Sequence, residues 1–116
     1  MGMVEREDRD GVGILRFKDI QFLDEIAYQN LQQALDEIWR GPDAAKIIIN
    51  MDGVRLVSTS VWGKLFVVSQ RSKKESRRVA LCGLGTLLRD AVRMLKLDKY
   101  LEIFEKEDDA VKAMAG

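Results

Sequence analysis

The sequence contains no histidine among its 116 residues. Without histidine the chain cannot build a Ser-His-Asp or Cys-His catalytic site or a zinc site with histidine ligands, and it lacks the commonest general base near neutral pH. Cysteine is nearly absent too, because Cys82 stands alone and can neither close an internal disulfide nor give a metal more than one thiolate. We therefore expect no catalytic residues, no metal and no cofactor, and we interpret Cys82 as a small core residue.

Long hydrophobic runs and an excess of one charge are missing as well. No apolar stretch approaches the length that spans a bilayer, and the charged start of the chain, residues 1–7, lacks the apolar segment of a secretory signal. Lysine and arginine together number 19, as do aspartate and glutamate, so no net positive field would gather nucleic acid or an anionic membrane. These absences predict a cytoplasmic protein that binds neither nucleic acid nor membrane.

What the sequence does contain suits one globular domain over residues 1–116. Hydrophobic residues make up 47% and charged residues 33%, the balance of a chain that folds around a single core. Strand patterns occur in five segments, namely 4–6, 12–17, 45–51, 78–82 and 101–104. Helical spacing occurs in four segments, namely 24–40, 61 to the basic stretch 71–74, 87–95 and 108–115. This alternation predicts an α/β domain with a mixed sheet of about five strands and four helices.

Several local features refine this prediction. Turn-forming residues 8–11 join the first two strands into a hairpin, and the nearly unbroken β-branched run at 45–51 suits the centre of the sheet. Gly41-Pro42 would end the first helix, and Thr86 would cap the third. The first helix is expected to bury Ile26, Ala27, Leu31, Ala34, Leu35 and Ile38. The third is expected to bury Leu87, Leu88, Ala91, Val92 and Leu95.

Three hydroxyl-bearing residues, Ser58, Thr59 and Ser60, lie between the predicted central strand and the following helix. Sites in α/β sheets tend to form where strands pass to helices. One hydroxyl is enough to cap a helix, so the other two could be present by chance. Alternatively, the run includes a phosphorylation site, because the amino end of a helix favours added negative charge. Both interpretations stay open on the residues alone.

Charged and aromatic neighbours surround this run. Arg55 and Lys64 lie close enough in sequence to pair with a phosphate there, although both could be ordinary solvated cations. Trp62 would be either an exposed interface anchor or a core residue beside Phe66. The glycines of segment 83–85 lack the remainder of a nucleotide-binding motif and favour a tight turn from strand to helix.

The segment from Asn50 to Gly63 resembles the STAS segment, in which an apolar strand leads through a Gly-Val turn to Asp-Ser-Ser/Thr-Gly-Leu-Gly. The resemblance continues in the same element order through 78–84, 87–88, 95–98, 103–104 and 108–110. The sequence is therefore similar to STAS domains of the anti-sigma-factor antagonist type. In this comparison Ser58 stands at the family's Asp, and Thr59 and Ser60 stand at its two hydroxyl residues. Val61 and Gly63 fall on its two glycines.

The resemblance implies a bacterial partner-switching protein that is not an enzyme. Such a protein binds an anti-sigma factor that is also a GHKL-type serine kinase, loses affinity when phosphorylated, and is restored by a PP2C-type phosphatase. Thr59 would be the first acceptor and Ser60 the second, and Ser58 could also serve. The residues expected to bind the partner are Arg55, Ser58, Thr59, Ser60, Trp62 and Lys64.

Two alternatives to this switch stay open. The same fold could act as a scaffold without phosphorylation or as a module that senses a nucleotide or a lipid. A small enzyme acting through Asp52, Lys18 or Cys82 is the third hypothesis, and the lack of histidine and of a clustered catalytic set argues against it.

Overall fold

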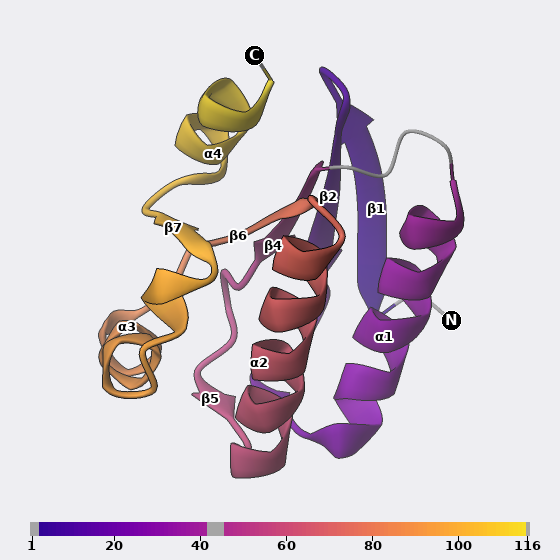
Figure 1. Cartoon of the computed structure of the whole chain (residues 1–116). Coiled ribbons are helices and arrows are strands. Elements are labelled where there is room, and N and C mark those ends of the chain that lie inside the picture. The colour runs from indigo at the N-terminus through magenta and orange to yellow at the C-terminus, as the bar shows by residue number, and fades with distance from the viewer. Residues whose placement is uncertain (1–2, 42–45, 116) are drawn as a thin grey trace.

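The computed structural model describes residues 3–41 and 46–115, and its centre is a five-stranded sheet with the order β1-β2-β4-β6-β7 (Figure 1). Its strands are β1 (Val4–Arg9), β2 (Val12–Phe17), β4 (Lys46–Asn50), β6 (Arg78–Cys82) and β7 (Glu102–Phe104). β1 runs antiparallel to β2, and the other neighbours are parallel. The predicted mixed α/β sheet, with β4 at its centre, is confirmed.

Four helices cover the two faces of this sheet. They are α1 (Glu25–Arg40), α2 (Thr59–Lys74), α3 (Thr86–Met94) and α4 (Glu107–Met114). A 3-10 turn, η1 (Leu97–Lys99), follows α3. The first three helices pack in the main core with Ile47 and Ile49, whereas α4 packs in a smaller core with Ile48 and Cys82. Since side chains alternate along a strand, consecutive isoleucines of β4 point into opposite cores.

The turn of the hairpin is shorter than the sequence suggested. β1 continues to Arg9, so only Asp10 and Gly11 form the turn. Both have a positive φ, 52° at Asp10 and 79° at Gly11, which is the conformation that two-residue hairpin turns require.

Gly41 ends α1 as predicted, whereas the starts of α2 and α3 differ from the prediction. α2 begins at Thr59, two residues earlier than expected, and runs through the basic stretch to Lys74. Gly85 occupies the N-cap of α3, so the prediction that Thr86 caps this helix is wrong. The N–H of Gly41 bonds to the carbonyl of Ile38 at the end of α1, whereas Pro42 and Ala45 lie outside the described residues.

Three apolar side chains that the helical pattern assigned to the core are exposed. Ile26 is 75% exposed because it lies on the outer side of the first turn of α1, whereas Ala27 and Tyr28 of the same turn face the core. Leu87 and Leu95 are also exposed, since α3 covers the end of the sheet mainly through Leu88 and Val92.

A second, two-stranded parallel sheet was not predicted. It pairs β3 (Phe22–Leu23) with β5 (Leu56–Val57), and Phe22 lies opposite Leu56. Both strands directly precede a helix, β3 before α1 and β5 before α2, so this small sheet holds the amino ends of the two helices side by side.

Candidate functional site

The start of α2 is fixed by the segment that follows the central strand. After β4, the chain turns through Gly53, whose φ of +85° favours glycine, and Val54 anchors the turn in the core. The backbone N–H of Arg55 then donates to the carbonyl of Gln21 at 2.7 Å, and that of Ser58 donates to the carbonyl of Leu23 at 3.0 Å. These bonds hold the hydroxyl run against the segment that enters α1.

The three hydroxyls have different roles in this arrangement. Ser58 is the N-cap of α2, and its Oγ accepts a hydrogen bond from the backbone N–H of Val61 at 3.3 Å. The Oγ atoms of Ser58 and Ser60 are 3.2 Å apart and share a hydrogen bond. Thr59 and Ser60 are exposed, and the first turn of α2 contains no acidic residue. Capping is therefore confirmed for Ser58, and the other two hydroxyls lie on an accessible helix start.

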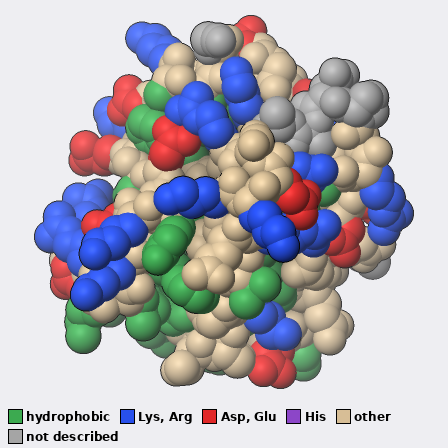
Figure 2. All heavy atoms as spheres, viewed as in Figure 1, with side chains coloured by type: hydrophobic (Ala, Val, Ile, Leu, Met, Phe, Trp, Pro, Cys, Tyr) green, Lys and Arg blue, Asp and Glu red, His purple; other side chains and the backbone are tan. Residues whose placement is uncertain are grey.

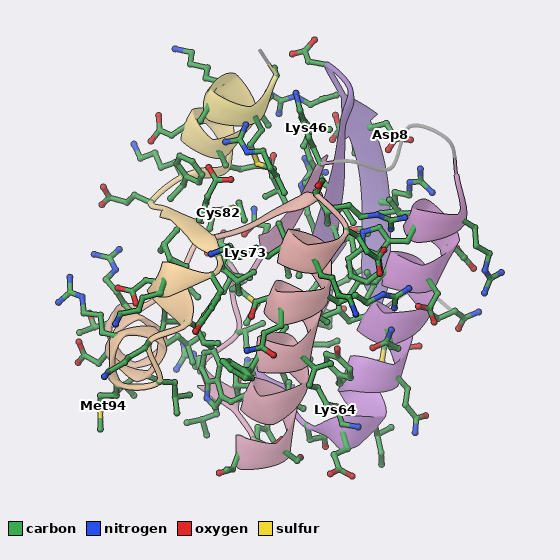
Figure 3. The ribbon with its side chains drawn as sticks, in the orientation of Figure 1. Asp8, Lys46, Lys64, Lys73, Cys82 and Met94 are labelled. Carbon is green, nitrogen blue, oxygen red and sulfur yellow. The ribbon has the colours of Figure 1, made fainter. Side chains whose placement is uncertain are left out.

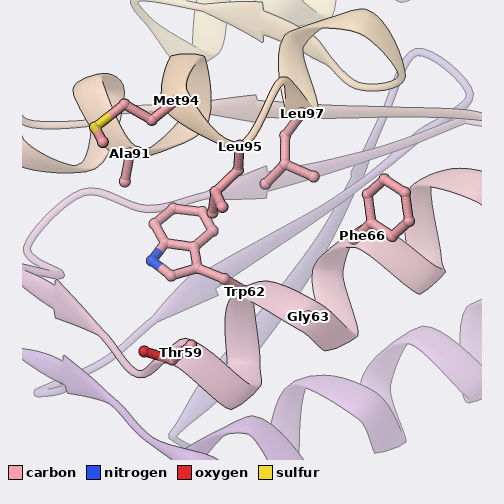
Figure 4. Close-up of a pocket in the computed structure, with 8 residues that line it drawn as sticks. All are labelled: Thr59, Trp62, Gly63, Phe66, Ala91, Met94, Leu95 and Leu97. Atoms are coloured by element: carbon pink, nitrogen blue, oxygen red, sulfur yellow. The ribbon is translucent and has the colours of Figure 1, made fainter.

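Trp62 lies in the main core and borders an apolar groove between α2 and α3 (Figure 4). Its side chain is only 8% exposed, so it is not the exposed anchor considered from the sequence. The groove has a volume of about 490 Å³ and is lined by Thr59, Trp62, Gly63, Phe66, Ala91, Met94, Leu95 and Leu97. Thr59 is thus the one candidate acceptor that also borders this groove.

The two candidate cations point away from the groove. The Nζ of Lys64 lies 5.8 Å from the ring centre of Tyr28, so this side chain is turned toward α1 (Figure 3). Arg55 borders a separate cavity of about 440 Å³ together with Asp52 and Arg89. The structure therefore groups the three hydroxyls and Trp62 but does not gather Arg55 and Lys64 in one cavity with them.

Cys82, one of the residues of the enzyme hypothesis, is not placed to react. Cys82 is fully buried on the side of the sheet that α4 covers. Burial raises the pKa of its thiol to about 12, so the reactive thiolate is scarce near neutral pH. Within the described ranges, no three His, Cys, Asp or Glu side chains are grouped closely enough to hold a metal ion. The interpretation of Cys82 as a core residue is confirmed.

A half-buried polar cluster on the face of the sheet that α4 covers was missed by the sequence analysis. The guanidinium of Arg16 donates two hydrogen bonds to the carboxylate of Glu107 at 2.8 and 2.7 Å, and the amide of Asn50 donates a third at 2.9 Å. The bonds from Arg16 hold the pKa of Glu107 below its usual value. The Oδ1 of Asn50 in turn accepts from the N–H of Asp52, which links this cluster to the segment that leads to α2.

The loop after β6 completes this end of the sheet. Gly83 has a φ of +71°, and a Cβ at this position would lie 2.7 Å from the Oδ1 of Asn50 and 2.9 Å from the backbone nitrogen of Asp52. The tight turn from strand to helix predicted for segment 83–85 is therefore present, and its glycine leaves room for Asn50.

These features define a small α/β domain whose helix start, next to the central strand, presents hydroxyl groups beside an apolar groove. The model of the STAS domain matches residues 3–110, and the chain therefore belongs to the STAS domain family. No curated protein matches the sequence significantly. Within the described ranges, no helix has the length and apolar character to cross a membrane.

Solved structures with this fold include two described as anti-sigma-factor antagonists and one described as a cell fate determinant. A putative anti-sigma factor antagonist from Thermotoga maritima is 16% identical, with 98% of this chain and 96% of that chain covered and a TM-score of 0.83. An anti-sigma-factor antagonist (STAS) domain protein from Planctomyces limnophilus is 20% identical, with 98% of both chains covered and a TM-score of 0.83. The Bacillus cell fate determinant SpoIIAA in its phosphorylated form is 16% identical, with coverage of 95% and 97% and a TM-score of 0.71. At these identities the likeness shows a common fold.

Proposed function

We propose that this protein is an anti-sigma-factor antagonist that switches between partners through phosphorylation at the start of α2. Its partner would be an anti-sigma factor with GHKL-type serine kinase activity, and a PP2C-type phosphatase would reverse the modification. The family supports this role, as do the structural neighbours described as anti-sigma-factor antagonists. The protein would act as a ligand and a substrate, and the chemistry would belong to the kinase.

The position of Thr59 is the observation that carries this proposal. Thr59 is the first residue of α2 and is exposed, and among the described residues its hydroxyl takes part in no hydrogen bond. Ser58 is used for capping, and Ser60 shares a hydrogen bond with Ser58. A kinase could therefore modify Thr59 without breaking a bond that holds the fold, so Thr59 ranks first as acceptor and Ser60 second.

Phosphorylation at this point would change binding more than folding. A phosphate adds a charge of about −1.5 to −2, which the amino end of a helix tolerates because its unpaired N–H groups carry partial positive charge. No acidic side chain in the first turn of α2 opposes it. The same charge would lie beside the apolar groove, where it would repel an apolar or acidic partner surface.

The surface around Thr59 is suited to contact with a protein. Phe22 and Leu56 pair across the small sheet and are 51% and 57% exposed. Met94 on α3 is 82% exposed on the other side of the helix start. Figure 2 shows hydrophobic side chains gathered at the lower left of this face, where α3 lies in Figure 1. Exposed apolar patches of this kind mark interaction sites.

Phosphate mapping with a cognate GHKL-type kinase tests the switch. After incubation with kinase and ATP, mass spectrometry should find the phosphate on Thr59, and Thr59→Ala should remove most of it. Ser60→Ala is the matched control, because it removes the neighbouring exposed hydroxyl, and it should leave most of the incorporation in place. Titration calorimetry should show that Thr59→Glu weakens binding to the anti-sigma factor at least tenfold.

Two results would contradict parts of this proposal. If Ser58, Thr59 and Ser60 all stay unmodified after incubation with ATP and a kinase that binds the protein, the phosphorylation switch is excluded. Unchanged partner binding in both Ser58→Asp and Thr59→Glu would favour the scaffold alternative.

A further inference from the structure

The groove between α2 and α3 has the composition of a site for an apolar molecule. Six of its eight lining residues, namely Gly63, Phe66, Ala91, Met94, Leu95 and Leu97, provide no hydrogen-bonding side-chain group. Its volume of about 490 Å³ lies within the usual range of small-molecule sites. From Thr59 to Phe66 it follows α2 for seven residues, or about 10 Å at the helical rise. A single chain of medium length suits these dimensions.

Gly63 leaves the α2 side of the groove open. It is exposed, and a Cβ added there would meet no atom within 4 Å. An alanine at this position of a helix would ordinarily be more favourable than glycine. The packing of this chain therefore does not require the glycine, whereas an occupant of the groove would benefit from the space.

The two polar groups of the groove lie at one end. Figure 4 shows the indole nitrogen of Trp62 turned toward the end where Thr59 and Ala91 lie. Trp62 as a whole is more than nine-tenths buried, but its indole nitrogen remains accessible, and no described residue accepts a hydrogen bond from it. The N–H is therefore a donor that an occupant of the groove can engage in place of water.

The electrostatics at this end favour an anionic acceptor. Thr59 is the first residue of the 16-residue α2, so the partial positive charge of the helix start lies here, and the first turn carries no acidic residue. An indole N–H and a hydroxyl can both donate to the same small anionic group. A carboxylate matches these donors, and an aliphatic chain attached to it would lie along the apolar walls.

We propose that this groove binds a medium-chain fatty carboxylate, with the carboxylate at Thr59 and Trp62 and the chain directed toward Phe66 and Leu97. The bound headgroup would cover the hydroxyl of Thr59. If Thr59 is the phosphoacceptor of the proposed switch, ligand binding and phosphorylation exclude each other. This regulatory consequence rests on the proposed function, whereas the binding itself does not.

Nuclear magnetic resonance on the full chain tests the site without a kinase, so its result is independent of the proposed function. The ¹⁵N-labelled protein is titrated with decanoate below its micelle concentration. The indole signal of Trp62 and the backbone amides of Thr59 and Gly63 should shift and saturate at one ligand per chain. The indole signal of Trp39, which does not line the groove, should stay in place and serves as the internal reference. The loss of one indole signal in Trp62→Phe assigns the two.

Fatty carboxylates of different length and variants of the groove make the test more specific. Each methylene buried should tighten binding about fourfold, so decanoate should bind about 15-fold tighter than octanoate. Gly63→Leu fills the groove from its α2 side and should abolish the shifts. Val67→Leu is the matched control, because Val67 is exposed on the same helix but does not line the groove, and it should bind as the natural chain does.

Four results would overturn the proposal. The first is the absence of a saturable shift, and the second is equal binding in Gly63→Leu. The third is binding of decyltrimethylammonium as tight as that of decanoate, which would show that the helix start does not select a carboxylate. A groove that takes an amphipathic peptide of the anti-sigma factor but not decanoate would also contradict it and would assign the groove to the protein partner.

Discussion

At the scale of single residues, Ser58 and Thr59 are neighbours with separable roles. Ser58 accepts a bond from the helix N–H of Val61, whereas Thr59 is exposed beside it. Ser58→Ala should therefore lower the free energy of unfolding by about 1 kcal/mol, because an N-cap is lost. Thr59→Ala should change it by less than about 0.5 kcal/mol. Urea denaturation followed by circular dichroism measures both.

Ser58→Asp is the control for this capping role. Aspartate also caps helices and adds a negative charge at the helix start, so the variant should keep the stability of the natural chain or exceed it slightly. If Ser58→Ala and Thr59→Ala were equally destabilising, the division of roles between the two hydroxyls would be wrong.

Two glycines are expected to respond to alanine with opposite signs. At Gly83 a positive φ and the contact with Asn50 leave no space for a Cβ, so Gly83→Ala should destabilise the protein by about 2 kcal/mol or more. Gly63 lies in a helix, and a Cβ added there would meet no neighbouring atom. Gly63→Ala should therefore leave the stability of the protein unchanged or raise it by up to about 1 kcal/mol. Thermal and urea unfolding of the two variants together check the contrast, and destabilisation by Gly63→Ala would show that the groove is tighter than described.

At the scale of elements, periodicity predicted the longer elements of the fold well. The run of three isoleucines in β4 pointed to a strand buried on both faces, and the structure has it there. The pair β3 and β5 was missed because a strand of two residues has no detectable period. Yet this pair fixes the start of α2, so the geometry of the candidate site depends on an element that the sequence does not reveal.

Helical spacing identifies an apolar face but not how much of it is covered. Leu87 and Leu95 carry the same signal as Leu88 and Val92, although only the latter two reach the core. The difference arises from where the sheet ends, which is a tertiary property. The exposed apolar side chains of α3 and the groove they border therefore could not be predicted from the pattern alone.

At the scale of the whole molecule, α4 is the one helix on its face of the sheet in the described part of the chain. It contributes only Ala110, Val111 and Met114 to the smaller core, so much of its attachment depends on Glu107. Glu107 joins Arg16 of β2 and Asn50 of β4, which are 91 and 57 residues away in sequence. In the sequence, the only sign of this cluster was an arginine in the otherwise apolar strand Val12–Phe17, and that arginine did not identify Glu107 as its partner.

The Arg16–Glu107 cluster should make the stability of the protein depend on acid pH. The folded state lowers the pKa of Glu107, so its contribution is complete above the unfolded-state pKa of about 4.3 and is lost as the pH falls through the lower folded-state value. Glu107→Gln should lower the free energy of unfolding at pH 7 by about 1–3 kcal/mol, because charged hydrogen bonds to Arg16 are lost.

The same substitution should also flatten the decline in stability between pH 5 and pH 3, as measured by urea denaturation at each pH. Glu102→Gln is the matched control, because Glu102 pairs with Arg78 in a similar two-bond geometry and its pKa is also lowered. Both partners of that pair are about 40% exposed, whereas the side chain of Glu107 is 16% exposed. Solvent screening should therefore keep the effect of Glu102→Gln below about 1 kcal/mol. Equal effects of the two variants would mean that α4 is held by its apolar contacts and that the cluster at Glu107 adds little.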